Sequence, residues 1–148
     1  MEHVFSVNSL DELSRVMPAA GGTVFTLGHT KPGDGGGGLF HWQTDSVDPP
    51  DSGTVVSCID EKTGRWKRID SGPINVRWFG ALGDGSDATQ ALQAALDAAH
   101  EGGTVYIPSG VYSIKRSLKI PQGTTLYGDG FLTRLQFTGK EWTCCLAS

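Results

Sequence analysis

Alternating apolar and polar positions predict several short strands in the first seventy residues. Four runs rich in β-branched or aromatic residues are bounded by turn residues, at 23–27, 39–43, 54–59 and 65–69. In the last run, Trp66 alternates with Arg65 and Lys67, which predicts one apolar face and one solvated face. Residues 62–64 (KTG) have the composition of a hairpin turn that leads into it.

A short helix is predicted ahead of these strands. Ser9 and Glu12 have the three-residue spacing of a capping box, in which each side chain bonds the backbone N–H of the other. Four apolar residues then fall on one helical face: Leu10, Leu13, Val16 and Met17. Pro18 ends the helix, because proline lacks the N–H that a helix needs. Residues 1 to about 70 are therefore predicted to form a small helix plus an antiparallel β module.

The longest helical pattern covers about residues 87–100. Asp87 can cap its N-terminus while Gln90 bonds back, and Gly102 and Gly103 end it. Its apolar stripe consists of Ala88, Leu92, Ala95, Leu96 and Ala99. The stripe predicts a helix that covers an apolar core.

Further short strands follow this helix at close intervals. They are predicted at 104–107, 111–114, 118–120, 125–127 and 134–137, and residues 74–79 read as another brief strand after a turn cluster at 70–73. Because no two-residue hairpin signal joins the later strands, they fit successive sides of a parallel β-solenoid better than a meander. Solenoids need about three repeats to bury their core. This chain holds fewer, so we expect the natural protein to continue beyond Ser148.

Composition narrows the class of protein. The 148 residues allow one ordinary domain plus an appended element, and 21 glycines are about twice the usual share, which suits many tight turns. The net charge of −4, with no dense basic window, argues against a nucleic-acid partner. No apolar run is long enough to span a bilayer and no Sec signal is recognisable, so no membrane insertion is expected. Three cysteines do not form a disulfide framework, which fits folding in a reducing cytosol.

Two glycine-rich segments have partial likeness to ligand loops. Gly33, Gly35 and Gly38 satisfy G-x-G-x-x-G, but the dinucleotide motif needs a helix after it, and here a strand is predicted. We expect these glycines to serve backbone geometry instead. Residues 80–87 contain aspartates and glycines without the spacing of a calcium loop or the lysine of a P-loop, so a turn leading to the helix cap is predicted.

No catalytic, cofactor-binding or metal site is predicted in this chain. Six acids lie in predicted turns and are expected to be solvated: Asp45, Asp48, Asp51, Asp60, Glu61 and Asp129. Nothing in the sequence forces a pair of them to the separation that glycoside hydrolysis requires.

The histidines, cysteines and tryptophans do not form a recognisable catalytic or metal-binding motif either. His3, His29, His41 and His100 lack metal-ligand spacing, and Cys58, Cys144 and Cys145 form no C-x-x-C motif, so the cysteines are expected to fill interior space. Trp42, Trp66, Trp78 and Trp142 are predicted to lie in the core or an oligomer interface, with sugar stacking as the alternative.

The second half carries a recognisable family signature. Residues 78–96 (WFGALGDGSDATQALQAAL), 103–112 (GTVYIPSGVY) and 125–130 (TLYGDG) resemble the start of the pectate-lyase-like right-handed β-helix superfamily. The resemblance covers about residues 74–137 and implies that the helix caps the open end of the coil. Only Ser86, Asp87 and Ala88 stand between the Gly-Asp-Gly turn and Thr89, so a second acidic residue usual in the family is absent. These motifs are specific for the fold. They do not indicate a reaction, because proteins that share this fold carry out different chemistries.

The first half resembles a module found at the front of phage tailspikes. The resemblance rests on residues 22–25 (GTVF), 33–40 (GDGGGGLF), 51–54 (DSGT) and 64–68 (GRWKR), directly upstream of the β-helix start. We predict a mainly β fold with two short helices: a small N-terminal antiparallel β module (1–72) that anchors to the virion, followed by the helix-capped first coils of a right-handed parallel β-helix (73–148).

The resemblance also implies a function. A homotrimeric tailspike of the virion, assembled in the host cytoplasm, would dock a tail or baseplate protein through residues 1–72. The parent protein would bind and degrade a host surface polysaccharide through parts beyond Ser148. This segment itself would not be an enzyme and would hold no cofactor. A free-standing pectate-lyase-like lyase or hydrolase, and a self-contained adaptor that docks another tail protein, are the alternatives.

Overall fold

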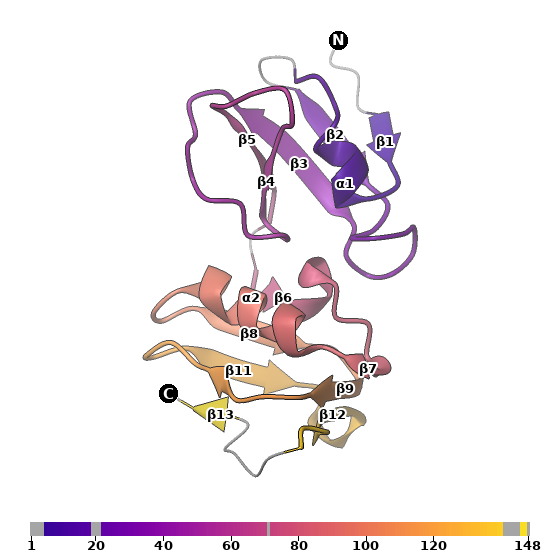
Figure 1. The fold of residues 1–148 in the computed structure, drawn as a ribbon, viewed down its shortest axis with the longest axis vertical. Helices are drawn as coiled ribbons and strands as arrows, with labels where there is room; N and C mark the ends of the chain where they lie inside the picture. The colour runs from indigo at the N-terminus through magenta and orange to yellow at the C-terminus, as the bar shows by residue number, and fades with distance from the viewer. Residues whose placement is uncertain (1–4, 19–21, 71, 141–145, 148) are drawn as a thin grey trace. The chain divides into compact units, whose positions relative to one another are not determined.

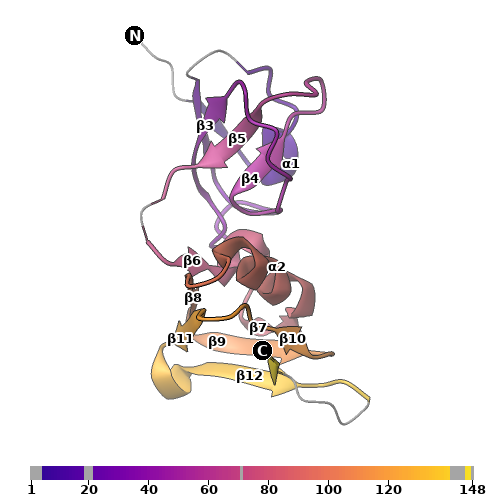
Figure 2. The same cartoon turned by 90° about the vertical axis from the view of Figure 1, so that its left-hand side faces the viewer.

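The computed structural model describes residues 5–18, 22–70, 72–140 and 146–147. The chain divides into two compact units, Met1–Ser71 (unit 1) and Gly72–Ser148 (unit 2), which are drawn in Figures 1 and 2. Among the described residues, neither helix has the length and apolar character needed to cross a bilayer. Ser148, where we expected the natural protein to continue, lies outside the described residues.

Unit 1 is a five-stranded sheet. Its spatial order is β1 (Phe5–Val7), β2 (Thr23–Thr26), β3 (Gly38–Gln43), β5 (Arg65–Arg68) and β4 (Val55–Ser57). The four predicted strands are confirmed, and their pairs are antiparallel. Strands β2, β4 and β5 are shorter than predicted, whereas β3 begins one residue earlier. The sequence did not predict β1, which adds to β2 in parallel (Figure 1). Its three residues are too few to show a period.

The first helix is shorter than predicted. α1 spans Leu10–Leu13 only, with the Ser9 hydroxyl accepting a hydrogen bond from the Glu12 N–H. The Glu12 carboxylate accepts from the N–H of Asn8 at 2.7 Å, one residue before the expected partner. Met17, which was predicted to share the buried face, is 67% exposed. The helix ends early because the Ser14 hydroxyl donates a hydrogen bond to the Asp11 carbonyl and so competes with the backbone bonds of the helix.

The core of unit 1 lies on one face of the sheet. Its buried members are Leu10, Leu13, Val24, Phe40, Trp42, Val56, Cys58 and Trp66. The rings of Trp42 and Trp66 meet edge to face with centroids 5.3 Å apart. These tryptophans confirm the prediction of a core location, and Cys58 is buried as expected.

Gly64 should not tolerate a side chain. Its φ is +99°, and a Cβ there would lie 2.1 Å from the Trp42 ring. Gly33 also has a positive φ, +81°, but a Cβ there would meet nothing within 4 Å. We expect Gly64→Ala to lower the free energy of unfolding by about 2 kcal/mol more than Gly33→Ala, because only the first adds a clash to the backbone strain. Urea denaturation of both variants measures the difference, and equal losses would contradict the argument.

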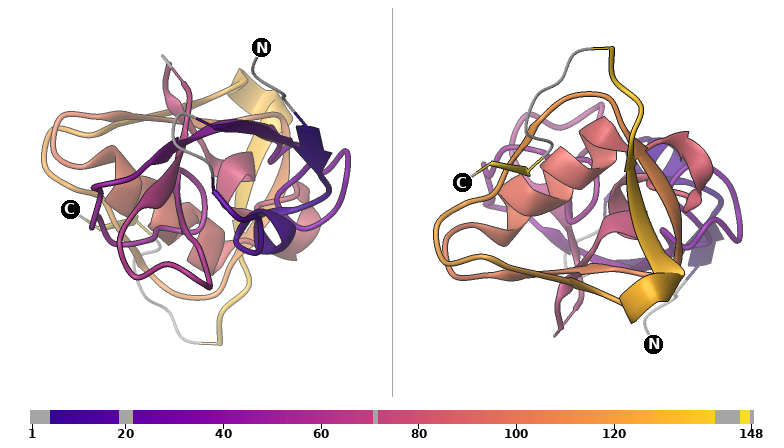
Figure 3. Two further views of the ribbon diagram at one scale, coloured as in Figure 1. Left: turned by 90° about the horizontal axis from the view of Figure 1, so that it is seen from above. Right: turned by 90° about the horizontal axis from the view of Figure 1, so that it is seen from below.

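Unit 2 is built from parallel strands. One sheet contains β6 (Ile74–Asn75), β8 (Thr104–Ile107) and β11 (Thr125–Gly128), and another contains β7 (Asp84–Asp87), β9 (Gly110–Ile114) and β12 (Thr133–Phe137). A third pairs β10 (Leu118–Lys119) with β13 (Leu146–Ala147). The chain visits the sheets in turn, so residues of successive coils stack, as the right-hand view in Figure 3, seen from below, shows. The predicted β-helix start is confirmed.

Two segments of unit 2 differ from the sequence prediction. Only Ile74–Asn75 of the brief strand predicted at 74–79 is extended, because the Asn75 side chain caps a 3₁₀ helix, η1 (Val76–Phe79), by accepting from the Arg77 N–H at 2.9 Å. The predicted turn at 80–87 contains strand β7, which pairs with β9 across an irregularity. All four β7 residues are exposed, so the hydrophobic pattern gave no signal for it.

Helix α2 (Thr89–Ala99) covers the coil of β8, β9 and β10 (Figure 2). Its residues Ala88, Leu92, Ala95 and Leu96 are buried with Val105, Ile107, Tyr112, Ile114 and Leu118, while Ala99 is partly buried. The helix begins two residues later than predicted. Ala88 is the N-cap, so the capping box of Asp87 with Gln90 does not form. Asp87 instead accepts a hydrogen bond from the Thr89 N–H at 3.0 Å.

Candidate interaction surface

The glycine-rich loop between β2 and β3 is organised by one carboxylate. Asp34 is 8% exposed and accepts hydrogen bonds from four backbone N–H groups, those of His29, Thr30, Lys31 and Gly36, at 2.8 to 3.1 Å. Burial raises the pKa of this carboxyl, but the four donors outweigh it and hold the pKa below 3.8. Gly33 and Gly35 have positive φ, as expected for a loop of this kind. Strand β3 follows, so the loop lacks the helix of a dinucleotide site.

Asp34→Asn is expected to destabilise unit 1 by about 2 kcal/mol, because an amide NH₂ would replace one acceptor of two N–H donors. The depressed pKa means that the wild-type carboxylate stabilises the fold above pH 3.8 and that this contribution is lost as pH falls through the lower folded-state pKa. Urea titrations at several acid pH values should therefore show a steeper loss for the wild type than for the variant. The exposed Asp45→Asn is the matched control, and identical profiles for wild type and Asp34→Asn would contradict the prediction.

Arg68 joins this loop to the next one. Its guanidinium donates to the carbonyls of Gly36, Gly37 and Gly53, each at 2.8 Å, and lies 4.7 Å from the centroid of the Phe40 ring. The residue is 8% exposed, and burial lowers its pKa to about 10, so it stays charged at neutral pH. The sequence pattern placed Arg68 only within the predicted strand at 65–69. Its place on the same alternating face as Trp66 was the signal that could have revealed its burial.

Three of the six candidate acids have hydrogen-bond or ion-pair partners, although Asp48 and Asp129 are exposed as predicted and only Asp51 is half-buried. Asp51 accepts from the N–H groups of Gly53, Thr54 and Val55 at 2.7 to 2.9 Å and so fixes the turn before β4. Asp48 forms an ion pair with Lys67, and this hydrogen bond lowers its pKa. In unit 2, Asp129 accepts hydrogen bonds from Tyr106 and Ser109. Asp45, Asp60 and Glu61 are exposed as expected.

The face of the unit 1 sheet opposite the core carries an outer apolar row of Phe25, Leu39 and Ile69. Phe25 and Leu39 are cross-strand partners, and the Ile69 N–H donates to the Leu39 carbonyl at 2.8 Å. The three side chains are 39%, 39% and 52% exposed. The row extends over β2, β3 and the residue that follows β5, and contiguous exposed apolar side chains are one feature of surfaces that another protein covers.

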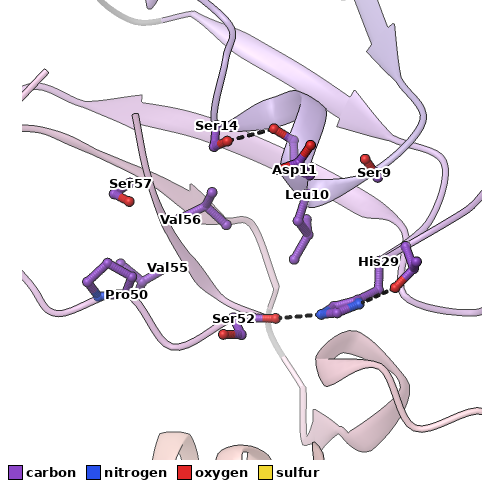
Figure 4. A pocket seen from close by; sticks show the side chains of 11 residues that line it. Ser9, Leu10, Asp11, Ser14, His29, Pro50, Ser52, Val55, Val56 and Ser57 are labelled. Atoms are coloured by element: carbon purple, nitrogen blue, oxygen red, sulfur yellow. Dashed lines mark hydrogen bonds between the residues drawn. The ribbon is translucent and has the colours of Figure 1, made fainter. Parts of the chain in front are cut away.

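A cavity of about 370 Å³ opens between α1 and β4 of unit 1 (Figure 4). Leu10, Pro50, Val55 and Val56 give its apolar lining, and serines surround them. One wall is closed by His29, whose Nε2 lies 3.0 Å from the Ser52 carbonyl and therefore donates to it. The Nδ1 atom lies 3.0 Å from the Thr30 hydroxyl. Ser52 has a φ of +69°, a conformation held by the neighbouring Asp51 turn.

The start of α2 in unit 2 is tied to the coil by Thr89, a residue of the family signature. Thr89 is 1% exposed, and its hydroxyl donates to the Asp87 carboxylate at 2.6 Å while accepting from the Lys115 N–H at 2.8 Å. The hydrogen bonds from Thr89 lower the pKa of Asp87. Gln93 makes a second tie, because its amide both accepts from the Lys119 N–H and donates to its carbonyl. The helix thus protects the edge of β10.

Asp129 of the Gly-Asp-Gly motif links two successive coils. Its carboxylate accepts from the Tyr106 hydroxyl at 2.9 and 3.0 Å and from the Ser109 N–H at 2.8 Å. The hydrogen bond raises the pKa of Tyr106, whose ring stacks on Tyr127 of the next coil with centroids 5.1 Å apart. These contacts hold the two turns in register and give the motif a structural role.

The remaining candidate residues that the structure describes lie apart from one another. Trp78 is partly buried against the unit 2 core, while His41 and His100 are exposed. His3, Trp142, Cys144 and Cys145 lie outside the described residues. Within the described ranges, no group of three or more histidine, cysteine or acidic side chains is placed to hold a metal ion.

Both halves of the chain match known families. Residues 6–71 match the family described as "Phage tail protein small four-stranded beta-sheet domain", and residues 73–141 match "Rhamnogalacturonase A/epimerase, pectate lyase-like". Tailspike protein 2 of an Escherichia coli O157:H7 bacteriophage is similar over 95% of this chain and 18% of its own, with a TM-score of 0.82 and 23% identity. The chain has the fold of the N-terminal part of a phage tailspike. Its first unit is similar to the tail β-sheet domain, and its second unit is similar to the pectate-lyase-like β-helix start.

Two further relatives mark the extent of this likeness. The tailspike of Acinetobacter baumannii phage AM24 is similar over 90% of this chain and 24% of its own, with a TM-score of 0.69 and 26% identity. Mannuronan C5-epimerase AlgE3 of Azotobacter vinelandii is 65% identical over 44 residues, which are 28% of this chain and 2% of the relative. The chain therefore spans a small part of the proteins that it resembles.

Proposed function

We propose that the chain is the N-terminal structural segment of a phage tailspike. Residues 1–72 would attach the spike to a tail or baseplate protein of the virion, and residues 73–148 would cap and start the β-helix. The observation that carries this proposal is the order of the two folds, with a tail-type sheet at 6–71 followed directly by a pectate-lyase-like coil at 73–141. The outer apolar row gives unit 1 a surface suited to protein contact.

The parent protein would recognise and degrade a host surface polysaccharide. In this proposal the spike is a homotrimer assembled in the host cytoplasm, and the catalytic carboxylates lie outside this segment. The contacts of the candidate acids support that division, since Asp51 binds backbone N–H groups of its own turn and Asp129 binds the Ser109 N–H of the preceding coil.

Retention on tail particles tests the attachment. The 148-residue chain, carrying a fluorescent label, is mixed with purified phage tails assembled without their spike and sedimented. We expect the chain to sediment with the tails and to be displaced by unlabelled chain. Absence of displaceable binding would overturn the attachment role.

Light scattering after size-exclusion chromatography tests the oligomeric state. A mass near three times the 15.7 kDa of one chain would place trimer contacts within these residues. A monomer would remove that support and restrict trimer contacts to other parts of the parent protein.

The second candidate is the N-terminal part of a free-standing polysaccharide lyase or glycoside hydrolase. The local identity with a mannuronan C5-epimerase favours it, because 44 residues of this chain are 65% identical to a protein whose name is that of an enzyme. In that case unit 1 would be an accessory cap. The tail-sedimentation experiment separates the two candidates, since only the tailspike segment would bind tails.

A further inference from the structure

The cavity between α1 and β4 has the features of a peptide site, and this inference rests on the proposed attachment role of unit 1. Its volume of about 370 Å³ exceeds what one apolar side chain fills, and its floor is formed by Leu10 and Val56, which are 7% and 8% exposed. Figure 4 shows both side chains directed into the space between helix and strand. Such a floor favours an aliphatic or aromatic group.

The walls of the cavity are fixed in advance. The turn before β4 is held by Asp51, and His29 is bonded to the carbonyl of Ser52 at 3.0 Å. The opposite wall is α1, which Ser9 caps. A cavity with fixed walls loses little conformational entropy when a ligand enters.

The free edge of β4 adds a backbone recognition element. The Arg68 N–H donates to the Thr54 carbonyl, and because bonded and non-bonded pairs alternate in an antiparallel ladder, Val55 and Ser57 direct their backbone groups away from β5. The backbone groups of Val55 are already bonded to Asp51. The Val55 carbonyl accepts from the Asp51 N–H, and the Val55 N–H donates to the Asp51 carboxylate. Among the described residues, no backbone hydrogen bond outside the strand ladder is found for the N–H and C=O of Ser57, a lining residue. They can pair with an extended peptide.

The negative charge at the rim of the cavity determines which kind of peptide fits best. Asp11 is the one carboxylate in the described lining, and that lining contains neither lysine nor arginine. Its side chain is 74% exposed, and its ion pair with Arg15 at 3.3 Å is exposed too, so the pair contributes little and can be exchanged. A basic residue beside the apolar anchor therefore complements the rim.

We propose that this cavity binds an extended segment of the tail partner, with one apolar side chain seated on Leu10 and Val56 and an adjacent lysine or arginine at Asp11. The peptide backbone pairs with Ser57. The site is separate from the outer apolar row, which lies on the opposite face of the sheet.

Nuclear magnetic resonance of the full 148-residue chain tests the site with defined probes. The probe is acetyl-Gly-Lys-Leu-Ser-Gly-amide at millimolar concentration, compared with peptides in which glutamate replaces lysine or alanine replaces leucine. We expect amide shift changes centred on Leu10, Val56 and Ser57, with affinity about tenfold weaker for either altered peptide. Changes centred on the outer apolar row, or a response to maltose with none to the peptide, would overturn the proposal.

Variants link the cavity to attachment. Ser57→Trp fills the cavity from a half-buried position, and Val47→Trp, at a site 70% exposed, is the control for an added indole. Far-UV circular dichroism verifies that both fold, and Asp11→Lys provides a second variant that alters only the rim. We expect Ser57→Trp and Asp11→Lys to lose peptide binding and retention on spike-free tails, and Val47→Trp to keep both.

The two proposals fail in different ways. If wild-type chain binds tails and Ser57→Trp binds equally well, the cavity is not the docking site and the attachment role stands. If wild-type chain does not bind tails, the attachment role fails, and the peptide titration alone decides whether the cavity recognises an apolar and basic segment.

Discussion

Replacing Arg68 by methionine is expected to lower the free energy of unfolding of unit 1 by about 3 to 5 kcal/mol. The variant keeps much of the side-chain volume but leaves the carbonyls of Gly36, Gly37 and Gly53 without their donor in a buried place. It also removes the guanidinium from the Phe40 ring. Two loops that are far apart in sequence would lose their common anchor, so the whole sheet module should unfold earlier.

Urea unfolding monitored by tryptophan fluorescence measures this loss, because Trp42 and Trp66 report on the unit 1 core. Arg68→Lys should recover only part of the stability, since an ammonium group cannot match the planar fork of three donated bonds. Arg15→Ala is the control, because its ion pair with Asp11 is exposed and contributes little. A loss below about 1 kcal/mol for Arg68→Met would show that the carbonyls find other donors.

Leu96→Ala is expected to cost unit 2 about 2 to 5 kcal/mol. Leu96 is 1% exposed on α2, in the same buried cluster as Val105 and Ile114 of the coil, so the shortened side chain leaves a cavity between helix and strands. A coil of short parallel strands has few other apolar contacts to compensate. Loss of the helix contact should therefore unfold the cap and the coil together.

Thermal unfolding by far-UV circular dichroism checks this expectation. Leu132→Ala is the matched control, because Leu132 belongs to the same unit and is 57% exposed, so its truncation should change stability by no more than about 0.5 kcal/mol. Equal destabilisation by both variants would mean that α2 is not essential to the packing of unit 2.

The local patterns predicted most of the elements because the residues that form them are consecutive. Four strands of unit 1, helix α2 and the strands of the coil lie close to where periodicity indicated them. Strands β1 and β7 escaped prediction, since the first is three residues long and the second is wholly exposed. Both exist because a neighbouring strand supplies their hydrogen bonds. Pairing of this kind depends on residues distant in sequence.

The sequence by itself determined the mainly β class, the order of the two modules and the parallel character of the coil, because alternation, turn residues and family motifs are local signals. Only the tertiary structure decided the roles of individual polar residues. Asp34, Asp51, Arg68 and Thr89 look like ordinary turn or surface residues until the loops and strands that they join are brought together. The cavity beside β4 arises for the same reason. Its walls come from separate segments of the chain, and no sequence pattern encodes the space between them.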